Sequence, residues 1–189
     1  MNALLLIDLQ IDFLSDNGRL PVGAANAERV ISVANSMVAL FEERHWPIVV
    51  ISNQFKGSDV IGNIFRRYAS IEGSEGGKID PRVLVHDVRH FSKAKSSAFT
   101  NPDFSSYLKM AGIRHVVICG VYAEGCVRAT AIDAKRANLE TVVLSDGVSS
   151  NRESRYKWAL SHMLNRGIQI MSFEDYLERH SNKQQEPFH

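Results

Sequence analysis

Four short apolar runs alternate with segments of helical periodicity, and this alternation restricts the fold more than any other feature of the chain. Each run is continuously apolar, which is typical of strands buried on both faces of a parallel sheet. Strands that alternate with helices predict a doubly wound α/β fold: a mainly parallel sheet with helices on both faces, in three layers. The four runs lie at residues 3–7, 46–51, 115–119 and 141–144.

The segments between these runs predict the helices. The clearest helix is expected from about Asn26 to about Arg44, where Val30, Val33 and Met37 belong to a single apolar stripe. Glycines after two of the later segments are typical of helix ends. We expect further helices at about 103–110, 125–137, 153–165 and 173–179, and a last edge strand at 168–170.

The chain is expected to form one domain. Its 189 residues, 44% of them hydrophobic, suffice for one core that buries roughly 70% of the surface exposed in the unfolded chain. Because no repeat or linker divides the sequence, we assign residues 1–180 to a single domain and 181–189 to a polar tail. The glycine-rich stretch 55–88 has little periodicity and predicts a long excursion over one edge of the sheet.

Charge and hydropathy argue against several kinds of partner. The 22 Lys and Arg residues are balanced by 21 Asp and Glu residues, so no basic excess favours nucleic acid. The longest apolar run ends before Asp8, far short of the ~20 residues needed to cross a bilayer, and no basic region precedes it. Two cysteines are too few for a disulfide framework or a thiolate metal site. We expect a cytoplasmic protein that binds neither nucleic acid nor a membrane.

Three residues with complementary chemistry are expected at the carboxyl ends of the strands, where ligands bind in this fold. Asp8 ends the first strand, Lys93 follows a short apolar segment, and Cys126 begins the helix after the third run. A helix N-terminus and an ammonium group favour a thiolate, and a carboxylate can accept the thiol proton and later return it. Together, a nucleophilic thiol, a carboxylate base and an ammonium group are suited to acyl transfer. Singly, each residue has an ordinary alternative: a turn-capping aspartate, a solvated lysine or a buried thiol, which is what we expect of Cys119.

Three motifs lie in a characteristic order along the chain. Residues 5–13 read Leu-Leu-Ile-Asp-Leu-Gln-Ile-Asp-Phe, residues 93–99 fit the pattern K-x-x-x-S-A-F, and residues 112–131 form a longer block around the second cysteine. In this order they resemble the isochorismatase-like cysteine hydrolases, a family of nicotinamidases, other amidases and isochorismatases. The motif spacing selects Lys93 rather than Lys95, and the resemblance extends over nearly the whole chain.

The resemblance implies a mechanism. Cys126 would attack the carbonyl of a small molecule, Asp8 would act as general base and then acid, and Lys93 would stabilise the charges. The reaction would cleave an amide-type C–N bond through a thioester, without a cofactor. The family also implies a cis peptide between Val121 and Tyr122, with the backbone N–H groups of Tyr122 and Cys126 facing the oxyanion. Like its relatives, the protein is expected to be a homo-oligomer, either a dimer or a tetramer.

The sequence departs from the family pattern in two places. Many nicotinamidases carry Asp-x-His and a further His after the second strand and bind a divalent metal there, whereas residues 52–57 of this chain contain no histidine. We therefore expect no metal. Residues 121–123 look more like those of isochorismatases, in which Gly usually replaces the nucleophile, but this chain keeps Cys126. A vinyl ether hydrolase that uses Asp8, and a non-catalytic binding or assembly module, remain as alternatives.

The substrate is a small molecule that the sequence does not name. The specificity of the protein for its substrate is expected to depend on residues 53–90, in which we find no motif. Flat or apolar acyl groups would suit the aromatic side chains near the motifs, although the two phenylalanines could equally belong to the core. From position alone, the candidate pocket residues are Phe13, Gln54, Phe55 and Tyr122.

Overall fold

A computed structural model describes residues 1–181, so the tail predicted at 181–189 lies outside the described residues except for Ser181. Six strands form one sheet in the order β3-β2-β1-β4-β5-β6, and every neighbouring pair is parallel. The predicted doubly wound α/β class is confirmed. The strands are β1 (Asn2–Ile7), β2 (Ile48–Asn53), β3 (Arg89–Lys93), β4 (His115–Val121), β5 (Glu140–Ser149) and β6 (Gln169–Met171).

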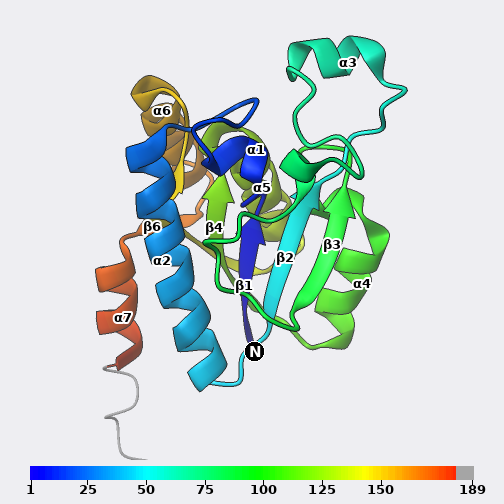
Figure 1. Cartoon of the computed structure of the whole chain (residues 1–189). Helices are drawn as coiled ribbons and strands as arrows, with labels where there is room; N and C mark the ends of the chain where they lie inside the picture. The colour runs from blue at the N-terminus through cyan, green and yellow to red at the C-terminus, as the bar shows by residue number, and fades with distance from the viewer. Residues whose placement is uncertain (182–189) are drawn as a thin grey trace, which may run out of the picture.

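Helices cover both faces of this sheet (Figure 1). Side chains of β1 alternate between the two cores: Leu4 and Leu6 pack with residues of α2, whereas Leu5 and Ile7 pack with residues of α4, α5 and α6. Both faces of β1 are buried, which explains its continuous apolar sequence. The α-helices are α1 (Ile11–Leu14), α2 (Ala24–Glu43), α3 (Val60–Phe65), α4 (Pro102–Met110), α5 (Arg128–Arg136), α6 (Glu153–Leu164) and α7 (Phe173–Ser181).

The chain reverses its direction of travel across the sheet between β1 and β4. From β1 it continues to β2 and β3 on one side, and later from β4 to β5 and β6 on the other. Such a reversal opens a crevice beyond the carboxyl ends of the two central strands, where ligands of doubly wound proteins bind. In the register of the sheet, Ile7 at the end of β1 lies opposite Gly120 near the end of β4.

Helices α1 and α3 were not expected from the sequence, and two further elements differ from the expectation. Strand β3 was not predicted as a strand. Most of its residues are exposed at the sheet edge, so no continuous apolar run marks it. The helix expected at 125–137 is divided into a π-helical turn, η3 (Ala123–Val127), and α5, because the backbone of Gly125 is not helical. Among residues 1–181, no helix has both the length and the apolar composition needed to cross a membrane.

The excursion between β2 and β3 carries α3 and a short 3-10 helix, η1 (Glu75–Gly77). Helix α3 stands out beyond the carboxyl ends of β2 and β3 rather than lying along the sheet edge (Figure 1). The excursion returns to the domain through an isolated bridge between Gln10 and Ile79. Residues 55–79 thus border the end of the sheet at which the candidate site lies, and the remainder returns past α2 to the start of β3 (Figure 1).

Candidate active site

Asp8 follows the last residue of β1 and adopts a left-handed backbone conformation, with φ of 55°. Residues other than glycine rarely adopt this conformation, and where they do the surrounding structure holds them there. The backbone N–H of Asp8 donates a hydrogen bond to the carbonyl of Ile51 at 2.8 Å, which fixes the start of this turn. The Asp8 side chain is 1% exposed and lies against the ends of β2 and β3.

Lys93 ends β3 and forms a buried ion pair with Asp8. Its Nζ lies 2.9 Å from Asp8 Oδ2, and neither side chain is more than 1% exposed. Burial raises the pKa of Asp8, an effect that the Lys93 ammonium only partly opposes. Burial alone would lower the pKa of Lys93, but the charges of Asp8 and Cys126 leave it raised overall. Lys93 therefore stays cationic at neutral pH, whereas Lys95 is exposed to solvent.

Cys126 lies in η3, the turn that connects β4 to α5. Burial first, and then the neighbouring Asp8 carboxylate, raise the pKa of the Cys126 thiol to about 12, although Lys93 acts in the opposite direction. The expectation that a helix N-terminus and an ammonium group would lower the pKa of this thiol is therefore wrong. The desolvation and the carboxylate outweigh the ammonium, so the thiol holds its proton until a base removes it.

Asn53, which none of the three motifs contains, joins the three predicted residues. It ends β2, and its Nδ2 donates hydrogen bonds to Asp8 Oδ2 at 2.8 Å and to Cys126 Sγ at 3.4 Å. Its Oδ1 accepts a hydrogen bond from Lys93 Nζ at 2.7 Å. A signal was available: Asn53 is the polar residue that ends an apolar strand, and the carboxyl ends of parallel strands meet at one edge of the sheet.

The strand end before Tyr122 approaches β1 unusually closely. Gly120 has φ of 139°, and a Cβ at this position would lie 2.0 Å from the carbonyl oxygen of Ile7. Only glycine fits such a contact. The following Val121–Tyr122 peptide is cis. The Tyr122 hydroxyl donates a hydrogen bond to the carbonyl of Leu20, so the loop after α1 is attached to the site.

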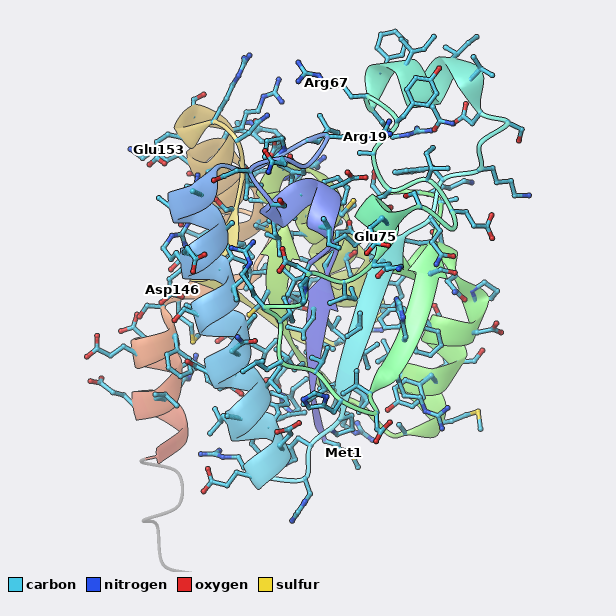
Figure 2. The ribbon with its side chains drawn as sticks, viewed as in Figure 1. Met1, Arg19, Arg67, Glu75, Asp146 and Glu153 are labelled. Atoms are coloured by element: carbon cyan, nitrogen blue, oxygen red, sulfur yellow. The ribbon has the colours of Figure 1, made fainter. Side chains whose placement is uncertain are left out.

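A buried carboxylate attaches two loops to α1 at the same end of the sheet. Asp12 accepts hydrogen bonds from the backbone N–H of Arg19 at 3.2 Å and of Ser70 at 2.8 Å. The Asp12 carboxylate also packs directly on Gly76. Arg19 and Arg67 lie close together between α1 and α3 in Figure 2, and Arg19 Nη1 donates to the Arg67 carbonyl at 3.5 Å. Asp12 thus holds both loops at this end of the sheet.

The four candidate pocket residues fall into two groups. Phe13 is 4% exposed in the core, and its ring meets the ring of Tyr122 edge to face at 5.8 Å between centroids. Gln54 borders a surface depression near His90 that includes none of the three predicted catalytic residues. The ring of Phe55 is covered by a guanidinium group, that of Arg66, at 3.9 Å. The structure brings Phe13 and Tyr122 together and places Gln54 and Phe55 on the β2 side.

Comparison with known proteins places this arrangement in a family. The model of the isochorismatase domain matches residues 2–175, nearly the whole chain. The chain belongs to the isochorismatase family. This family member is 27% identical to a probable inactive nicotinamidase of Arabidopsis thaliana, over 93% of this chain and 94% of that protein.

Solved structures of isochorismatase-like proteins have the same fold. An isochorismatase-like hydrolase from Alkaliphilus metalliredigens is 26% identical, with a TM-score of 0.86 over 94% of this chain and 98% of its own. A pyrazinamidase of Pyrococcus horikoshii in complex with zinc is 30% identical, with a TM-score of 0.81 over 90% of this chain and 98% of its own. The family contains hydrolases, and the fold of this member is theirs.

The zinc complex of the Pyrococcus relative invites a test of whether this family member could hold a metal. Within the described part of the chain, no group of three or more His, Cys, Asp or Glu side chains could bind one. The end of β2 presents Ser52 and Asn53, Gln54 follows, and the nearby His90 ring shares a hydrogen bond with Ser52 Oγ at 2.8 Å. Zinc prefers thiolate, imidazole and carboxylate ligands. This set does not fit a zinc site.

Proposed function

We propose that this isochorismatase-family protein is a cysteine hydrolase that cleaves the C–N bond of a small amide. One observation carries the proposal: Asn53 Nδ2 contacts both the Cys126 sulfur and a carboxylate, that of Asp8, which has one oxygen without a hydrogen-bond partner among the described residues. Asp8 Oδ2 is engaged by Lys93 and Asn53, whereas Asp8 Oδ1 has no hydrogen-bond partner among the described residues. A buried, unpartnered acceptor next to a nucleophile is what general base catalysis requires.

The first half of the reaction forms a thioester. Asp8 Oδ1 accepts the proton of Cys126, and the sulfur attacks the amide carbonyl carbon, so an S–C bond forms. The C–N bond then breaks, and the amine leaves with the proton that Asp8 returns. Lys93 keeps Asp8 ionised between these steps. In the resting site Asp8 has a raised pKa, which brings the carboxylate closer to the basicity that proton transfer at neutral pH requires.

The second half hydrolyses the thioester. Asp8 accepts a proton from water while the water oxygen attacks the acyl carbon, and the C–S bond breaks as the acid leaves. The proton on Asp8 returns to Cys126 and restores the starting state. The developing oxyanion would be stabilised by the backbone N–H groups of Tyr122 and Cys126, each contributing on the order of 3 kcal/mol.

The relatives support an amide as substrate, because pyrazinamidase and nicotinamidase are names of amidases. We further propose that the substrate enters between the loops held by Asp12, and that the protein acts as a homo-oligomer in the cytoplasm.

The alkylation rate of Cys126 tests the nucleophile without a known substrate. Iodoacetamide modification is followed by peptide mass spectrometry between about pH 6 and pH 9, with Cys119 as the buried internal control. Burial raises the pKa of Cys119, which lies inside β4, so this thiol should stay unreactive. Cys126 should react faster than Cys119, and Asp8→Asn should change the pH profile of Cys126 alkylation, because the carboxylate that raises the pKa of this thiol is removed.

Ammonia release from a panel of small primary amides then tests the reaction. Turnover should disappear in Cys126→Ala and in Asp8→Asn while both variants stay folded. A Cys126 as inert as Cys119 would refute the proposal. Activity that survives Cys126→Ala but not Asp8→Asn would refute the thioester and indicate ether hydrolysis.

A further inference from the structure

We propose that Asn53 is a further catalytic residue: its side-chain amide donates a hydrogen bond to the Cys126 sulfur as the thiolate forms and selects Asp8 Oδ1 as the base. This inference rests on the proposed function and assigns a fourth residue to it. Asn53 is 4% exposed, and its amide contacts Asp8, Lys93 and Cys126 together.

The orientation of the Asn53 amide is set by charge. Lys93 Nζ is a donor only and needs an acceptor, which Asn53 Oδ1 supplies at 2.7 Å. The Nδ2 group must then face Asp8 and Cys126. The flipped amide would place its NH₂ group against the ammonium and its oxygen against the carboxylate, so both contacts would become repulsive. Lys93 therefore keeps the Asn53 N–H bonds directed at the reacting atoms.

The backbone of Asn53 is held as firmly as its side chain. Gln10, which is fully buried, donates from Nε2 to the Asn53 carbonyl at 2.9 Å and accepts the Asn53 N–H at Oε1, also at 2.9 Å. A second bond from Gln10 Nε2 reaches the carbonyl of Gly77 at 2.6 Å. Gln10 thereby connects the end of β2 to the turn after β1 and to the excursion. These bonds hold Asn53 in position beside the Cys126 sulfur.

The two oxygens of Asp8 have different roles in this geometry: one accepts hydrogen bonds, and the other is available as the base. Lys93 and Asn53 both donate to Oδ2, and no described residue donates to Oδ1. The thiol proton therefore goes to Oδ1. As the sulfur becomes negative, the 3.4 Å contact from Asn53 Nδ2 becomes a hydrogen bond to a charged acceptor, which is stronger than one to a neutral thiol. Asn53 thus stabilises the ionised state that attacks the substrate.

The test compares Cys126 alkylation in Asn53→Ala and Asn53→Asp with that in wild type. Asn53→Asp keeps the side-chain shape but removes the donor and adds a negative charge, so it remains informative if Asn53→Ala does not fold. Asn63→Ala is the matched control, because Asn63 is also buried but donates to the Lys56 carbonyl outside the site. Iodoacetamide rates at Cys126 and Cys119 are measured between about pH 6 and pH 9.

Both Asn53 variants should slow Cys126 about tenfold at every pH in this range, because a rise of about one unit in the thiol pKa lowers the thiolate fraction tenfold. Cys119 and the Asn63→Ala control should be unchanged. A merely structural role would loosen the protein and speed both thiols, which is the opposite result. If Cys126 is reactive in the wild type and the Asn53 substitutions leave its alkylation rate unchanged, this inference is overturned and the proposed function is not. A wild-type Cys126 as inert as Cys119 overturns the proposed function and this inference with it.

Discussion

Replacing Lys93 with methionine leaves the Asp8 carboxylate buried without its counter-ion. The substitution removes the Nζ contacts with Asp8 Oδ2 at 2.9 Å and Asn53 Oδ1 at 2.7 Å, while the methionine fills much of the same space. Solvent cannot replace the lost partner, since both side chains of the ion pair are at most 1% exposed. Removing one partner of such a pair costs about 3–5 kcal/mol, and we expect this loss in the free energy of unfolding near pH 8.

The cost of Lys93→Met should fall as the pH is lowered. Burial already raises the pKa of Asp8, and removing the ammonium raises it further in the folded state only. The folded variant then holds a proton on Asp8 that the unfolded chain releases. Rising pH therefore favours unfolding of the variant, and falling pH reduces the loss in its free energy of unfolding. Once Asp8 is protonated, the variant lacks only hydrogen-bond partners for neutral groups. The loss in the free energy of unfolding caused by Lys93→Met should then fall to about 1–3 kcal/mol near pH 5.

Urea unfolding followed by circular dichroism at the two pH values measures both quantities. Lys95→Met is the matched control, because Lys95 is exposed two residues away and should change stability by no more than about 0.5 kcal/mol. The reasoning is refuted if Lys93→Met costs no more than the control, or if its cost is the same at both pH values.

Two further substitutions test the backbone around the site by the same unfolding measurement. Gly120→Ala should cost more than about 3 kcal/mol because its Cβ would collide with the Ile7 carbonyl, whereas Gly112→Ala, at φ of 63° with open space around it, should cost only about 1–2 kcal/mol. Equal costs would contradict the close approach of β1 and β4. Asp12→Ala should cost about 2–4 kcal/mol, because the N–H groups of Arg19 and the buried Ser70 lose a charged acceptor. A change within about 0.5 kcal/mol would show that Asp12 does not hold the loops.

The central strands could be predicted from the sequence because burial on both faces requires an unbroken apolar run. Residues 3–7 lie within β1, and the run at 115–119 lies within β4, as predicted. Edge strand β3 escaped prediction for the converse reason: its exposed face tolerates polar residues, so no run marks it. Its pairing with β2 depends on the position of the rest of the sheet, which a local pattern does not contain.

The motifs named Asp8, Lys93 and Cys126, and the structure brings all three side chains together through Asn53. The expected lowering of the Cys126 thiol pKa was wrong, since the balance between burial, one carboxylate and one ammonium depends on distances and on access to water. Asn53 was overlooked because a lone asparagine at a strand end has many ordinary explanations.

The sequence by itself determined the alternation of strands and helices and the order of the three motifs, because hydrophobic burial and residue chemistry are properties of a local segment. Only the tertiary structure decided which oxygen of Asp8 is free, which way the Asn53 amide faces and why Gly120 must lack a side chain. Each of these depends on contacts between residues at least 40 positions apart, which become neighbours only when parallel strands meet at one edge of the sheet.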